Sequence, residues 1–133
     1  MARGLRAVAM AVIAGTLALL MRRSVRYAVS GESMSPTLGE GDWVLARRTR
    51  VIRPGQIVVA ERPDRPGLEV VKRVVSVEAN GSWVTLAGDN PPASTDSRDF
   101  GPVRVEAVVG VVWLRYWPLR RVRVFGRGGA RRG

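Results

Sequence analysis

The fold is decided by residues 56–87, QIVVAERPDRPGLEVVKRVVSVEANGSWVTLA. Three runs rich in β-branched residues are separated there by turn-forming residues, RPDRPG at 62–67 and Asn-Gly at 80–81. Asn-Gly favours a two-residue type I′ hairpin turn, and the Pro/Gly-rich segment predicts a wider loop. The pattern therefore predicts consecutive paired strands over 56–60, 68–77 and 82–87.

Short strand patterns also occur on both sides of this stretch. VRYAVS at 25–30 alternates, DWVLAR at 42–47 follows a Gly-Glu-Gly break, and VVGVVWLRYW at 108–117 is ended by Pro118. Residues 88–103, GDNPPASTDSRDFGPV, predict a long irregular segment. Several short strands at regular spacing predict a mostly β domain, barrel-like or a sandwich.

The net charge of +11 lies in the two ends of the chain. Residues 1–26 carry five Arg and residues 119–133 carry six, with no acidic residue in either, whereas residues 27–118 carry eleven basic and eleven acidic residues. Basic ends beside an apolar segment suit anionic membrane headgroups better than a nucleic acid, so we expect no nucleic-acid partner. The Gly/Arg-rich tail at 119–133 is expected to be disordered.

An uncharged run, Ala7–Met21, lies between Arg6 and Arg22. Fifteen helical residues span about 22 Å, short of the roughly 30 Å hydrocarbon core, although flanking Arg side chains can snorkel. A cleaved signal peptide is the alternative, but RRSVR follows the run where a cleavage site would be expected. We therefore predict a retained single-pass anchor over 1–26 and a separate β domain over 27–118. The Arg residues flanking the run on its two sides are too evenly balanced to give the orientation.

The composition excludes several kinds of catalytic site. The chain has no Cys and no His, which removes thiol nucleophiles, the Ser-His-Asp triad and nearly every zinc site, so no metal or cofactor is expected. Of the 22 basic residues, 21 are Arg, which does not give up its proton in a protein. Lys72 is therefore the one conventional side-chain amine base.

Three segments could carry chemistry: the strand at 68–77, the loop at 30–42 and the stretch at 88–103. The stretch at 88–103 is either a surface loop or a support in which hydroxyls and the Asp96/Arg98 pair hold a buried lysine head. In the strand at 68–77, Lys72 and Arg73 point to opposite faces, and either cation can be the one that lies among valines. If Lys72 is buried, desolvation lowers its pKa and provides a base for a serine nucleophile. The loop SGESMSPTLGEGD at 30–42 holds three serines, Ser30, Ser33 and Ser35, and composition does not choose among them.

The order of these segments resembles type I signal peptidases and their mitochondrial inner-membrane relatives. The resemblance runs from about Ser30 to Pro118 through GESMSPTL, GDWV, RPGQIVVA, VKRVV, GDN, STDSRDFGPV and VVGVVWLRYWP. It implies that Ser33 is the nucleophile, that Lys72 is the general base and that the Ser33 N–H donates to the oxyanion. It also implies that the Ser94 hydroxyl orients the lysine and that Asp96 and Arg98 form a structural ion pair. The loop that would contact the oxyanion and the substrate contains Gly31, Met34 and Pro36.

The resemblance implies a serine endopeptidase that removes signal or leader peptides from precursor proteins, with its catalytic domain outside the cytoplasm. The short segment between Lys72 and Gly88 is also similar to maturation proteases of nickel-type superoxide dismutases, which act on one precursor and would place the domain at the cytoplasmic face. A non-catalytic membrane-anchored β module is the alternative from another class. Contact between Lys72 and Ser33 would distinguish an enzyme from such a module. The tryptophans are expected mostly in the core, with Trp117 as a candidate for a lipid interface.

Overall fold

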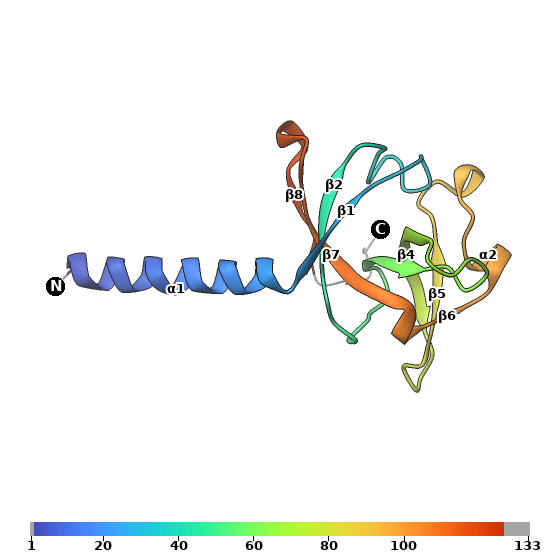
Figure 1. Ribbon diagram of the computed structural model, residues 1–133, viewed down its shortest axis with the longest axis horizontal. Helices are drawn as coiled ribbons and strands as arrows, with labels where there is room; N and C mark the ends of the chain where they lie inside the picture. Colours follow the sequence, from blue (N-terminus) through green and yellow to red (C-terminus); the bar gives the residue numbers. More distant parts are fainter. Residues whose placement is uncertain (1, 127–133) are drawn as a thin grey trace.

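The computed structural model describes residues 2–126 and consists of a long N-terminal helix followed by a β domain (Figure 1). Eight strands form one sheet in the order β1-β2-β7-β3-β4-β5-β6, with β8 pairing with β7, and every pair is antiparallel. The elements are α1 (Ala2–Arg22), β1 (Ser24–Ala28), β2 (Trp43–Arg47), β3 (Ile57–Glu61), β4 (Glu69–Val77), β5 (Trp83–Ala87), η1 (Pro91–Ala93), α2 (Ser97–Phe100), β6 (Val103–Arg104), η2 (Val105–Ala107), β7 (Val108–Trp117), η3 (Leu119–Arg121) and β8 (Arg123–Val124).

The predicted mostly β fold with an N-terminal apolar helix is confirmed. The strands belong to one continuous sheet, so the barrel-like alternative describes the domain better than a sandwich. Register shifts in β2–β7, β3–β7 and β4–β5 increase the local bend of the sheet. The bent sheet covers two clusters of buried, mostly β-branched side chains, one of which includes Met34 and Leu38 from the serine-bearing loop.

The three central strands follow the prediction from residues 56–87. Val59 pairs with Val71 between β3 and β4, and Val74 pairs with Leu86 between β4 and β5. The turn type differs from the prediction, because type I′ needs positive φ at both central residues and here only Gly81 has it, at 71°. Instead the Gly81 amide donates to Glu78 O at 2.8 Å, and Asn80 Oδ1 accepts from the Ser82 amide at 3.1 Å.

Residues 88–126 are more regular than the sequence predicts. Asp96 and Asp99 form a capping box that starts the short helix α2 inside the stretch expected to be irregular. The expectation of a disordered tail is wrong for residues 119–126, because η3 and β8 fold back onto β7 with Leu114 opposite Val124. β3 pairs with β7 only from Val108 to Val111, which leaves room on that edge for β8. Residues 127–133 of the predicted tail lie outside the described residues.

Helix α1 is longer than the apolar run that predicted it. Its 21 residues span about 31 Å, close to the hydrocarbon thickness of a bilayer. Within residues 2–126 it is the one helix long and apolar enough to cross a membrane, judged by length and composition, and none of its residues is buried. Ser24 Oγ donates to Leu20 O at 2.7 Å and accepts from Trp113 Nε1 at 2.9 Å, which joins the helix end to the sheet.

The tryptophans pack less deeply than expected. Trp43 and Trp117 are exposed, and the other two are only partly buried. Trp83 lies beneath the Arg104 guanidinium and Trp113 bonds to Ser24. The fully buried positions are instead taken mainly by valines, which fit the pleated inner face of the sheet.

Candidate active site

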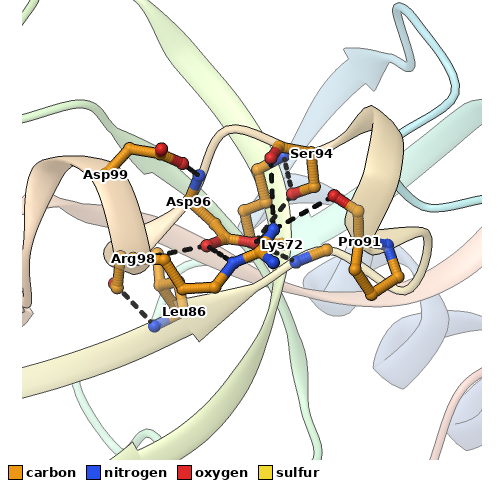
Figure 2. A network of polar contacts seen from close by, with 9 residues as sticks. Lys72, Leu86, Pro91, Ser94, Asp96, Arg98 and Asp99 are labelled. Carbon is orange, nitrogen blue, oxygen red and sulfur yellow. Dashed lines mark hydrogen bonds and ion pairs between the residues drawn. The ribbon is translucent and has the colours of Figure 1, made fainter.

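Lys72 is the buried cation of strand β4, with only 4% of its surface exposed. Its Nζ donates to Ser94 Oγ at 3.1 Å (Figure 2). Arg73 points to the other face, where its guanidinium bonds twice to Asp89 at 2.7 Å and once to Gly55 O at 2.8 Å. Burial is the main cause that lowers the pKa of Lys72 below its ordinary value. Of the two orientations that the sequence left open, the structure therefore has the one that provides an amine base.

Ser94 fixes the direction of the lysine amine. The Ser94 hydroxyl donates its hydrogen to Asp96 Oδ2 at 2.9 Å. A hydroxyl has only one hydrogen, so Ser94 can meet Lys72 only as an acceptor. One N–H of Lys72 is thus directed at Ser94, and the lone pair of a neutral amine must point elsewhere.

Asp96 is the buried centre of this network and has no exposed surface. Its carboxylate accepts hydrogen bonds from the Gly88 amide, Ser94, and the Arg98 amide and guanidinium, at 2.9–3.2 Å (Figure 2). Burial alone would raise the pKa of Asp96, but the bonds from Arg98, Gly88 and Ser94 hold the pKa well below the ordinary carboxyl value. Asp96 therefore stays ionised. The Arg98 guanidinium also donates to Pro91 O and Ser94 O. The structure brings the predicted residues Lys72, Ser94, Asp96 and Arg98 together.

Ser33 lies beside this network in the loop before β2. Its carbonyl accepts from the Asn90 amide at 2.9 Å, and Asn90 Nδ2 donates to Glu32 O at 3.0 Å. Ser33 and Lys72 line the same cleft, about 240 Å³ in volume. Within residues 2–126 the Ser33 hydroxyl forms no hydrogen bond, so the contact with Lys72 expected from the sequence is a shared cleft rather than a bond. Catalytic hydrogen bonds are often long in unliganded sites and tighten on substrate binding.

The other loop residues predicted for the site are divided by the structure. Gly31, with φ of 77°, and the buried Met34 line the cleft, as does Ser30. Pro36 is exposed and Ser35 half-buried, and neither lines the cleft, so Pro36 is not a wall of the site. Burial of Met34 and Leu38 anchors the loop in the core, and this leaves the Ser33 side chain beside the cleft.

Sequence reasoning gave no role to Gly88, Asp89 and Asn90, although it quoted their GDN motif. A Cβ on Gly88 would lie 2.6 Å from Ser33 O and 2.5 Å from Ser94 Cβ, and it would overlap Ser94 Oγ. Only glycine therefore lets the serine loop and Ser94 approach so closely. Asp89 joins the two sides again, because Thr37 Oγ1 donates to it at 2.6 Å and Arg73 binds it. The sequence signal that could have revealed these residues is that GDN directly follows the strand predicted over 82–87.

The far side of the cleft is an open strand edge. β5 pairs with β4 only from Arg73 onward, so residues Glu69–Lys72 leave one edge free of a strand partner. Tyr27 on β1, the edge strand of the sheet, donates from its hydroxyl to Glu69 O at 2.9 Å. A strand edge without a strand partner can hold an extended peptide by main-chain hydrogen bonds. No three potential ligands gather as a metal site in the part of the chain described.

Comparison with known proteins agrees with this geometry. The family model described as signal peptidase, peptidase S26, matches residues 2–80 and 77–117. The chain belongs to this family. It is 36% identical to mitochondrial inner membrane protease subunit 1 of Xenopus tropicalis, over 68% of this chain and 67% of the relative. The human subunit 1 is 33% identical over 68% of both chains, and the Schizosaccharomyces pombe subunit 1 is 32% identical over 67% of this chain and 71% of the relative.

Membership of the signal peptidase family confirms the resemblance found in the sequence. This member of the family is a peptidase of the signal peptidase type and is located at a membrane. The matched region covers α1 and the strands through β7, and therefore includes every residue of the lysine network. It ends at residue 117, before η3 and β8.

Proposed function

We propose that the chain is a serine endopeptidase in which Ser33 is the nucleophile and Lys72 the general base. One observation carries the proposal: the only lysine of the chain is buried in the cleft that Ser33 lines, and Ser94 holds its amine. A buried ammonium is costly unless it is paired with an anion. Lys72 bonds directly only to a neutral hydroxyl, and its pKa is lowered. Its environment therefore favours the neutral amine that a serine nucleophile requires.

The reaction is acyl transfer. Ser33 Oγ attacks the scissile carbonyl carbon while its proton passes to Lys72 Nζ, and the Ser33 amide stabilises the oxyanion. The Lys72 ammonium then donates this proton to the leaving amine as the peptide bond breaks. Lys72 next removes a proton from water as the water oxygen attacks the acyl carbon, and the Lys72 ammonium returns this proton to Ser33 Oγ as the ester bond breaks. Ser94 positions the amine, while Asp96 and Arg98 position Ser94.

The substrate is a leader or signal peptide bound in extended form. The edge at residues 70–72, which has no strand partner on the side of β5, offers backbone groups to such a peptide, and the cleft beside it is lined by Val29, Met34 and Val71. The resemblance to the family implies small residues before the cleaved bond, and these would enter this cleft. The partners are therefore precursor proteins delivered at the membrane.

The layout of the chain follows from the same argument. Residues 1–26 serve as a single-pass anchor and residues 27–118 as the catalytic domain, to which the folded segment up to residue 126 is added. The names of the relatives support a location at a membrane. As the resemblance implies, we place the catalytic domain outside the cytoplasm, with the cytoplasmic face as the alternative for a protease dedicated to a superoxide dismutase precursor. The short β4–β5 connection also fits a protease dedicated to one leader, such as that of a nickel-type superoxide dismutase precursor.

The test uses the full chain in detergent with two substrates, a secretory precursor and a nickel superoxide dismutase precursor. We expect cleavage of the secretory precursor to fall by at least about a thousandfold in Ser33→Ala, because the nucleophile is lost. Ser35→Ala, in the same loop but outside the cleft, is the matched control and should keep nearly full activity. Cleavage of only the second precursor would support the dedicated protease. Wild-type activity in Ser33→Ala would refute the proposed nucleophile, and a wild-type chain that trims neither precursor would favour the non-catalytic β module.

A further inference from the structure

Asp42 is a second buried carboxylate, outside the lysine network. It ends the loop that carries Ser33 and has 1% of its surface exposed. Its carboxylate accepts from the Gly39 amide at 2.9 Å, from Arg121 Nη1 at 3.0 Å and from Arg115 Nη1 at 3.4 Å. Two arginines thus meet one carboxylate at the base of the serine loop, and the reaction described above uses none of the three.

Arg115 connects this carboxylate to the backbone of two distant segments. It lies on β7, is 6% exposed, and donates from Nη1 to Thr37 O at 2.6 Å. Its Nε donates to Arg121 O at 2.6 Å. One guanidinium therefore bonds both to the serine loop and to the main chain of η3.

Arg121 belongs to the segment that the sequence analysis expected to be disordered. We call residues 118–125 the C-terminal arm. Its fold is fixed by the Arg121 amide, which donates to Pro118 O at 2.9 Å, and by pairing of Arg123 with Arg115. The arm lies beyond residue 117, where the match to the family ends. Its contact with Asp42 therefore lies outside the region matched by the family model.

The contacts of the arm determine where the serine loop can lie. The loop is closed at its base by the Val29 amide, which donates to Asp42 O at 2.8 Å. Asp89 and Asn90 hold its other side, through Thr37 and Ser33. Without the arm, the Asp42 carboxylate would still accept from the Gly39 amide and from Arg115, but it would lose its hydrogen bond from Arg121. The half of the loop from residue 38 to residue 42 would then be held less firmly. Because Leu38 N bonds to Met34 O at 2.9 Å, movement of that side is passed to the residue next to Ser33.

We propose that the C-terminal arm positions the nucleophile, with Arg121 as a positioning residue that holds the Ser33 loop through Asp42. This inference rests on the proposed role of Ser33. A misplacement of about 1 Å at a nucleophile can cost a hundredfold in rate, even when the substituted residue is far from the chemistry. Arg121 should therefore affect kcat without touching substrate.

The experiment compares Arg121→Ala with Arg120→Ala in the full chain. Arg120 is its exposed neighbour in η3 and is the matched control for charge. We expect Arg121→Ala to lower kcat about 10- to 100-fold, to change KM less than twofold, and to leave the pH at which activity rises unchanged, because the surroundings of Lys72 are intact. Arg120→Ala should behave as wild type. Arg121→Lys, which keeps a charged donor, should recover part of the rate. Equal losses in the two alanine variants, or no recovery in Arg121→Lys, would overturn the positioning role.

Two further variants keep the test decisive if Arg121→Ala lowers stability. Arg121→Gln keeps a donor without the charge, and a reduced kcat at unchanged Tm supports the proposal. Asp42→Asn combined with Arg121→Gln should lose no more rate than the worse single variant, because both act through one contact. Multiplicative losses would argue against it. If Arg121→Gln keeps the wild-type kcat while Ser33→Ala is inactive, the positioning role of the C-terminal arm is refuted but the proposed nucleophile is not. If Ser33→Ala is active, the proposed nucleophile is refuted.

Discussion

Lys72 Nζ and Ser94 Oγ lie 3.1 Å apart, although the two residues are 22 positions apart in the chain. Because Ser94 gives its hydrogen to Asp96, it cannot also donate to Lys72. Ser94 therefore orients the amine without competing with Ser33 for its lone pair. This arrangement makes the protonation state of Lys72 the property on which the proposed activity depends.

Lys72→Arg is expected to be as inactive as Lys72→Ala. Both should lower kcat by about a thousandfold or more, because arginine keeps its proton and a general base contributes roughly 10²–10⁴ in rate. The measurement is single-turnover cleavage of a leader-peptide substrate. Arg65→Lys, an exchange between the same two residue types at an exposed position, should have no effect. Comparable rates in the Lys72→Arg variant and the wild type would exclude Lys72 as the base.

The pH profile should respond in opposite directions to Asp96→Asn and Arg98→Gln. The kcat/KM rises with pH as Lys72 loses its proton, and burial places this rise below the ordinary lysine pKa of 10.5. The Asp96 charge raises the pKa of Lys72 and the Arg98 charge lowers it. Loss of the carboxylate should therefore move the rise to lower pH, and loss of the guanidinium should move it to higher pH. Shifts of the same sign in the two variants would contradict the assignment of Lys72 as the titrating group.

Gly88→Ala should reduce kcat about a hundredfold or more. The added Cβ would overlap Ser94 and would lie 2.6 Å from Ser33 O, so one of the two segments must move. Overpacking of this kind also costs about 1–3 kcal/mol of stability, which thermal unfolding can measure. Gly126→Ala, where a Cβ meets nothing within 4 Å, is the control. Normal activity of the Gly88→Ala variant would mean that this close approach is not needed for catalysis.

Trp117 is expected to contact lipid headgroups. It is 51% exposed at the end of β7 and is followed by Leu119, which is 71% exposed. In Figure 1 the connection from β7 to β8 lies to one side of α1 and, measured along the direction of this helix, reaches back to about where the helix ends. No acidic residue follows Glu106. Tryptophan and arginine favour an anionic membrane interface.

The measurement is quenching of Trp117 fluorescence by brominated lipids in vesicles containing the full chain. Variants that keep either Trp117 or Trp83 as the single tryptophan provide the comparison. Trp83 is the reference because it lies on β5 with its ring covered by the Arg104 guanidinium. Stronger quenching of Trp117 is expected. Equal quenching of the two would indicate that the end of β7 does not touch the bilayer.

Much of the fold could be predicted from local patterns. The strands over residues 56–87 and 108–117 have the β-branched composition and bounding turns that favour strands wherever they occur. Local patterns failed for the segment at 119–126, because polar, Arg-rich residues do not predict order. β8 is ordered by its pairing with a free stretch of the β7 edge, and that free stretch arises only from the register of β3.

The candidate site divides in the same way. The sequence alone reduced the possible side-chain amine bases to Lys72, because it contains no histidine and no second lysine. It could not say whether Lys72 or Arg73 faces the core, since an alternating strand allows both. The tertiary structure decided this, because the residue that shares a face with the Ser33 loop and Ser94 is set by the register of β4 against β3 and β5. Burial and charge depend on neighbours that are distant in sequence, so only the folded chain determines the pKa of Lys72 and the contact between Asp42 and Arg121.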